Sequence, residues 1–107
     1  MADVLTGKGY LVTTGNVAAL TAGGAETITL IGVTCCNIHE TVNSWLTLDV
    51  VRSGGVNSEI IHKVNLPIND SLDPLQGKIV LNSSDALFAI AENASSVELS
   101  LSYLVET

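Results

Sequence analysis

The sequence predicts an all-β fold: an antiparallel two-sheet sandwich of the jelly-roll or Greek-key kind, with about eight strands. The first observation is the strict alternation of residues 97–105, in which every second side chain is apolar and Ser or Glu fills most gaps, as in a strand with one dry face. The second is a series of short apolar runs bounded by turn-forming residues, without helical periodicity. Two such sheets bury their apolar faces against each other.

The last third of the chain predicts three strands, at residues 78–81, 86–91 and 97–105. Asn82-Ser83-Ser84-Asp85 and Asn93-Ala94-Ser95-Ser96 separate them, and side chains of these types hydrogen-bond nearby backbone and favour turns. Because the connections are short, we expect the three strands to form an antiparallel meander.

The middle of the chain predicts two long strands, residues 27–38 and 42–52, that meet near His39-Glu40-Thr41. Gly32 interrupts the β-branched first strand and indicates a bulge or bend. Ser53-Gly54-Gly55 predicts a tight turn, so residues 42–52 should fold back on a strand at 56–64. Pro67 cannot donate to a sheet and marks a strand end or edge, and residues 68–76 predict a loop with at most one short strand.

Residues 1–24 differ from the remainder because they are rich in glycine and threonine and poor in bulky side chains. Only Tyr10-Leu11-Val12 resembles a strand in this segment. Such a chain does not easily offset its ordering entropy. We therefore expect an extended N-terminal arm over residues 1–24, either mobile or ordered by a partner, and a β-sandwich domain over residues 25–107.

Composition and charge exclude several classes of function. The four basic residues are scattered among eleven acidic ones, for a net charge of −7, whereas nucleic-acid binding needs clustered Lys and Arg. No apolar run is long enough to span a membrane and no secretion signal is evident, so we expect a protein with reduced thiols. Only 14% of residues are charged, against about 25% in ordinary globular domains, which favours a surface packed against other proteins.

The residues with reactive side chains do not form a recognisable metal or catalytic motif. Cys35 and Cys36 are adjacent in a strand, so one should be buried and the other exposed or at an interface. Together with His39 they lack the spacing of a zinc site. Neither His39 nor His62 has a nucleophile in a recognisable context. We therefore expect no metal, no cofactor and no enzymatic activity.

The remaining candidates have structural interpretations. Asp70, Asp73 and Asp85 lie in loops where aspartate serves turns, and they lack the dense ligand spacing of a calcium loop. Trp45 is interpreted as a core or interface residue, since aromatic residues make up only 4% of the chain, too few to promise a sugar-stacking platform.

Over residues 25–106 the chain resembles a group of small tailed-bacteriophage virion proteins. The stretches that carry the resemblance are Arg52-Ser53-Gly54-Gly55, Leu66-Pro67-Ile68-Asn69-Asp70-Ser71-Leu72, Gly77-Lys78-Ile79-Val80-Leu81 with Asp85 and Leu87, and Ser100-Leu101-Ser102-Tyr103-Leu104-Val105-Glu106. The resemblance implies a β-sandwich in the virion, assembled in the host cytoplasm, as capsid cement or decoration or in the neck or tail.

From the resemblance we expect a capsid cement protein that forms a homo-oligomer, with a trimer as the expected state, and binds the major capsid protein or other virion proteins. A neck or tail component is the alternative within the same class. A carbohydrate-binding module on the virion is the alternative from another class. Tyr10, Leu11 and Val12 of the arm and Trp45 are the residues we expect at interfaces.

Overall fold

The computed structural model describes residues 3–107, which form nine β-strands. Their bounds are β1 Asp3–Leu11, β2 Val17–Thr21, β3 Thr27–Asn37, β4 Ser44–Val51, β5 Ser58–Leu66, β6 Ser71–Leu72, β7 Ile79–Leu81, β8 Ala86–Ala91 and β9 Val97–Glu106. Within this part of the chain, no helix is long and apolar enough to cross a membrane.

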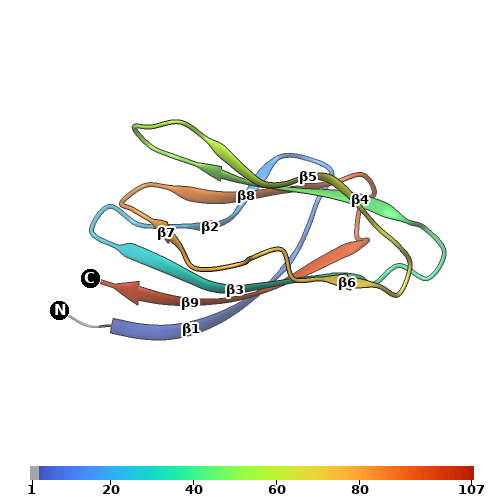
Figure 1. The fold of residues 1–107 in the computed structure, drawn as a ribbon, viewed down its shortest axis with the longest axis horizontal. Coiled ribbons are helices and arrows are strands. Elements are labelled where there is room, and N and C mark those ends of the chain that lie inside the picture. The colour runs from blue at the N-terminus through green and yellow to red at the C-terminus, as the bar shows by residue number, and fades with distance from the viewer. Residues whose placement is uncertain (1–2) are drawn as a thin grey trace.

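The strands form two antiparallel sheets that pack face to face (Figure 1). The first sheet has the order β1-β9-β3-β6, and β7 also pairs with β3. The second has the order β2-β8-β4-β5. Since β6 pairs with Cys35 and Cys36 whereas β7 pairs with Ile28–Leu30, β6 and β7 act as one interrupted strand along the same side of β3.

The topology is that of a jelly roll, which confirms the predicted fold class. Consecutive strands mostly alternate between the two sheets, and β4–β5 is the one pair of chain neighbours bonded to each other among the described strands. The predicted C-terminal meander is therefore wrong: β7 and β9 belong to the first sheet, and β8 lies between them in sequence but in the second sheet. Short turns join strands across the sandwich as readily as within a sheet.

Several local predictions are confirmed. In β9, the alternate residues Val97, Leu99, Leu101 and Tyr103 are buried. The register between β3 and β9 shifts between Leu30 and Gly32, as expected for a bulge there. The β4–β5 hairpin forms around the predicted turn, and β5 ends at Leu66, directly before Pro67.

The core lies between the two inner faces and is built from aliphatic side chains. Its largest fully buried members are leucines from both sheets, because alternating residues of each strand point inward and leucine fills the space between the layers. They are Leu30, Leu46, Leu48, Leu81, Leu87, Leu99 and Leu101.

The N-terminal segment differs from the arm expected from sequence. Over its whole length, β1 pairs with β9, from Asp3 with Glu106 to Leu11 with Glu98, and β2 pairs with β8. Residues 3–24 are thus part of the sandwich, while the first two residues of the predicted arm lie outside the described range. The arm was predicted because the segment has few bulky side chains. Gly7 and Gly9, however, lie opposite Ser102 and Ser100 on the outer face, where a strand needs no bulky side chain to fill the core.

Candidate interaction surfaces

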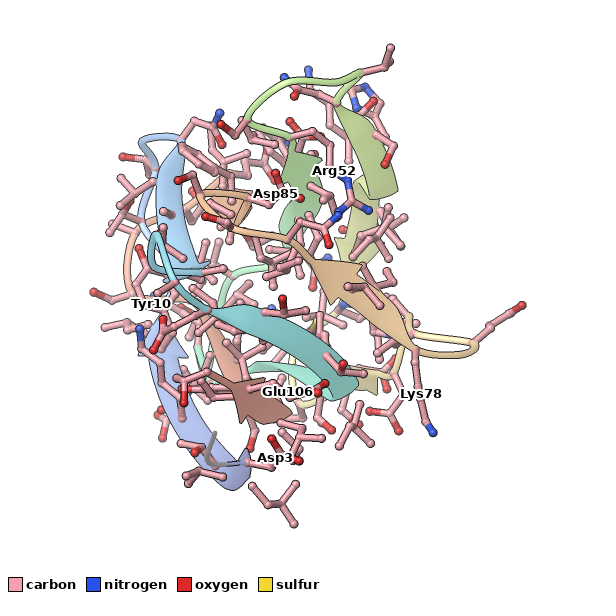
Figure 2. All side chains as sticks on the ribbon, turned by 90° about the vertical axis from the view of Figure 1, so that its left-hand side faces the viewer. Asp3, Tyr10, Arg52, Lys78, Asp85 and Glu106 are labelled. Atoms are coloured by element: carbon pink, nitrogen blue, oxygen red, sulfur yellow. The ribbon has the colours of Figure 1, made fainter. Side chains whose placement is uncertain are left out.

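The three residues predicted as contacts near the end of β1 have different environments. Tyr10 is half-buried and packs against the core, and Figure 2 shows it at the edge strand. Leu11 is 45% exposed, whereas Val12 is fully buried and its N–H donates to the carbonyl of Val97. Leu11 is therefore available to a partner. The Val12 side chain is a core residue and, contrary to the expectation, is not available.

Trp45 lies apart from these residues, in β4 of the second sheet, where it is half-buried. The ammonium of Lys63 stands 5.2 Å from the centre of its ring, a cation–π contact. Lys63 itself occupies a bulge of β5 with a positive φ of 46°, and its N–H donates to the Thr47 hydroxyl at 2.8 Å. The chain's own lysine thus covers a ring face that a stacking sugar would need.

The outer face of the first sheet carries no charge at its central positions, and we call it the neutral face. Within β9, the residues between the buried ones face outward. Residues paired across an antiparallel sheet point to the same side, so the residues paired with these in the neighbouring strands also face outward. Together they are Leu5, Gly7 and Gly9 of β1, Ser100, Ser102 and Leu104 of β9, Thr29, Gly32 and Thr34 of β3, and Val80 of β7.

The neutral face combines a centre of small residues with an apolar row. Leu5, Leu104, Thr29 and Val80 align across four strands, and Leu5 is 72% exposed. Beside them, glycines, serines and a threonine leave the backbone accessible. Acidic residues stand only at the two ends: Glu98 at one, and Asp3 with Glu106 at the other, where Figure 2 shows the last two at the ends of β1 and β9.

Arg52 and Asp85 form an ion pair that sequence reasoning missed. Asp85 is only 4% exposed, and its carboxylate accepts from Arg52 Nη1 at 2.9 Å, from the Ser53 N–H at 2.8 Å and from the Asn82 N–H at 3.0 Å. The same Arg52 nitrogen donates to the carbonyl of Val80. Figure 2 shows the two side chains pointing toward each other. The pair ties the β4–β5 turn to the β7–β8 turn.

The chemistry of this pair is structural. The hydrogen bonds from Ser53, Arg52 and Asn82 and the charge of Arg52 hold the pKa of Asp85 below its ordinary value, since each favours the ionised form. A polar hollow of about 580 Å³ beside the pair is lined by residues 52–56 together with Asn82, Ser83 and Asp85. Its two charged groups are paired with each other through Arg52 Nη1 and Asp85 Oδ2.

The cysteines and His39 also have structural environments. Cys35 is fully buried and Cys36 half-buried, as the alternation predicted. Burial, and then the charge of Asp73, raises the pKa of Cys35 to about 12, so this thiol is protonated and unreactive. His39 Nδ1 accepts from the Thr41 N–H at 3.1 Å. Across residues 3–107, no three His, Cys, Asp or Glu side chains are grouped to hold a metal ion.

Two acidic residues lie opposite each other on the second sheet. Asp49 of β4 pairs in register with Glu59 of β5. Partial burial, and then the charge of Glu59, raises the pKa of Asp49. Glu59 Oε2 in turn lies 2.6 Å from His62 Nδ1, and both side chains are well exposed. This is a solvent-facing arrangement of charges rather than an enclosed site.

The comparisons with known proteins identify a fold relationship. No protein-family model matches the sequence, and no curated protein is similar to it. Among solved structures, a chain in the acidic stable capsid structure of Helicobacter pylori bacteriophage KHP30 matches with a TM-score of 0.54 and 12% sequence identity. The match covers 98% of this chain and 87% of that chain, so the two are of comparable length and share the fold over nearly all of this chain.

Proposed function

We propose that this chain is a non-enzymatic structural protein of a phage particle, and specifically a capsid cement or decoration protein. In this role it binds the outside of the shell through the neutral face and holds neighbouring capsid subunits together. Its location is then the virion, and its partners are the major capsid protein and further copies of itself.

The observation that carries this proposal is the composition of the neutral face. The chain has a net charge of −7, yet ten aligned positions across four strands of the first sheet carry no charge. An exposed, uncharged surface with an apolar row suits a protein interface, because no charge must lose its water and few long side chains must be ordered. Leu5, Leu104 and Val80 supply the apolar contact area.

The fold likeness supports the same conclusion. The matched chain is part of a phage capsid structure and is of similar length, and the alignment spans nearly all of the present chain. In the proposed role, the sandwich presents one sheet face to the capsid shell while the loops at both ends of the sandwich remain free. Repeated over many copies, an interface of modest area resists the pressure of a packaged genome.

The oligomeric state is a separate part of the proposal. The resemblance in sequence led us to expect a trimer, while the edge strand discussed below argues for a pair of chains. The mass of the purified protein, compared with the 11.1 kDa of one chain, decides between them.

The experiment that tests the function is the stoichiometry of this chain in purified particles, measured by quantitative mass spectrometry against the major capsid protein. We expect hundreds of copies in a simple ratio to the capsid subunit. A handful of copies, in a multiple of three, six or twelve, overturns the cement role in favour of the neck or tail. Absence from the particle overturns the virion role altogether.

The role of the neutral face is tested by rebinding to capsids from which the protein has been stripped. Ser102 lies at the centre of the face between Gly7 and Gly32, so Ser102→Glu places a charge there without touching the core. We expect at least a tenfold loss of affinity. Asn65→Glu, on exposed β5 of the other sheet, adds the same charge and should bind normally. Equal binding of both variants contradicts the assignment of the face.

A further inference from the structure

The four sheet edges differ in how they are protected against pairing with another chain. β2 has five residues and a register shift, β5 has two register shifts and a residue at positive φ, and β6 and β7 have two and three residues. Short, bulged or twisted edges discourage strand addition. β1 has none of these features: its nine residues pair with β9 without a shift, leaving an edge about 30 Å long.

Exposed apolar side chains are concentrated on this same strand. β1 contains three of the exposed large hydrophobic residues: Val4 at 53%, Leu5 at 72% and Leu11 at 45%. A long, regular edge with exposed apolar side chains is a site for association unless something covers it. Lys8 does not block it, because its ammonium reaches to the Ala19 carbonyl of β2 at 2.7 Å, toward the other sheet.

We propose that β1 pairs antiparallel with β1 of a second copy of this chain, in a register centred on Gly7. In this register Gly7 faces itself, Thr6 faces Lys8, Leu5 faces Gly9, Val4 faces Tyr10 and Asp3 faces Leu11. The partner at the edge is thus the β1 strand of a second copy, because β1 can pair with itself in the antiparallel direction. This inference does not depend on the proposed function.

Two of the side-chain pairs in this register are favourable, one on each face of the sheet. On the outer face the exposed Leu5 lies over the bare backbone of Gly9, where an added Cβ would meet nothing within 4 Å. On the inner face Val4 meets the ring of Tyr10, and aromatic with β-branched pairs stabilise neighbouring strands. Each pairing occurs twice across the two-fold axis.

The charges on and near β1 also allow two copies to pair, despite the net charge of −7 on each chain. No two like charges face each other, since β1 carries only Asp3 and Lys8. The nearest acidic neighbours are Asp3 and Glu98 of the second copy, two strand spacings or about 10 Å apart, a distance that physiological salt largely screens.

The pairing has a geometric consequence for the neutral face. A two-fold axis perpendicular to the sheet keeps both outer faces on the same side. The first sheets of two copies then become one continuous sheet, with the two neutral faces joined across β1.

Cysteine cross-linking tests the register. In a Cys36→Ser background, Gly7→Cys should form a disulfide-linked dimer on mild oxidation, because directly opposite Cα atoms lie about 4.5 to 5.5 Å apart, within disulfide range. Gly9→Cys alone is the matched control. It has the same outward direction, but its counterpart in the second copy is four residues away along the strand, so it should not cross-link. A mixture of Leu5→Cys and Gly9→Cys proteins should cross-link.

The mass of the unmodified protein in solution completes the test. Light scattering should give twice the 11.1 kDa of one chain, and Leu5→Asp, at a residue too exposed to affect folding, should give one chain mass. A monomer or trimer for the unmodified protein overturns the proposal. So does a dimer in which Gly9→Cys cross-links as well as Gly7→Cys. None of these outcomes depends on how many copies a particle holds.

Discussion

At the scale of single residues, the Arg52–Asp85 pair has the densest set of contacts to a carboxylate in the described structure. One carboxylate receives two backbone N–H groups and a guanidinium, and the guanidinium also reaches the Val80 carbonyl. Charge-assisted hydrogen bonds of this kind are stronger than neutral ones. The pair joins the β4–β5 turn of the second sheet to the β7–β8 turn, which crosses between the two sheets. Its loss therefore affects the sandwich and not only one loop.

Asp85→Asn should lower the melting temperature at pH 7 by roughly 10 °C, because a charge and an acceptor are lost where donors remain. The pKa of Asp85 is lowered in the folded state, so its contribution is present above the unfolded pKa of about 4 and is lost as pH falls through the lower folded value. Melting curves between pH 2 and 7 should show the difference between the wild type and the variant shrinking toward acid.

The control for this prediction is Asp70→Asn. The Asp70 carboxylate is exposed and accepts one N–H, from Ser71 at 2.8 Å, so its replacement should change the melting temperature by only a few degrees. If wild-type and Asp85→Asn melting temperatures run parallel at all pH values, the ion pair does not contribute through its charge.

At the scale of elements, the backbone strain lies in three turns and in the bulge of β5. Lys63, Asn69, Ser84 and Ser95 have positive φ, a region that L-residues with a Cβ rarely occupy. Ser95, at 57°, belongs to the exposed turn that crosses from β8 to β9. The sequence predicted a turn at this place but not which residue would adopt the left-handed conformation.

Ser95→Gly should stabilise the protein by about 0.5 kcal/mol, since relief of the left-handed conformation outweighs the greater freedom of glycine in the unfolded chain. Urea unfolding at pH 7 measures this as an increase in the midpoint. Ala94→Gly in the same turn lacks a positive φ to relieve and should destabilise. A loss of stability in both variants would show that Ser95 is not strained.

Strands differ in how well their sequences predict them. β4 and β9 alternate buried and accessible residues nearly without exception, and residues 44–51 and 97–106 were recognised with bounds close to those observed. β2 was missed, because Val17-Ala18-Ala19-Leu20-Thr21 has small side chains and a register shift in place of a clean alternation. Its residues Ala19 and Leu20 are nevertheless buried. The opposite sheet can bury small residues even where the sequence lacks a clear alternation of apolar and polar side chains.

At the scale of the whole molecule, the distribution of charge bears on binding to particles. Three of the four basic residues have partners within the chain: Lys8 at the Ala19 carbonyl, Arg52 at Asp85 and Lys63 over Trp45. Figure 2 shows Lys78 directed away from the fold. Acidic residues outnumber basic ones by eleven to four, while the neutral face lies between its acidic ends.

If the neutral face is the binding surface, affinity for stripped capsids should change by less than about threefold between 50 and 500 mM NaCl, because apolar contacts are not screened by salt. Sedimentation of particles with bound protein at each salt concentration measures this. A loss of tenfold or more would mean that the acidic residues at the ends, and not the neutral face, bind the shell.

The chain's own pattern determined the fold class, six of the strands (β3, β4, β5, β7, β8 and β9) and the different burial of Cys35 and Cys36, because alternation, β-branching and turn residues act over a few neighbours. The tertiary structure decided which strands are neighbours, that the glycine-rich start is an edge strand, that Val12 is core, and that Arg52 meets Asp85 across 33 positions. These features depend on how two sheets stack, and local sequence does not specify which distant strand supplies a hydrogen-bond partner.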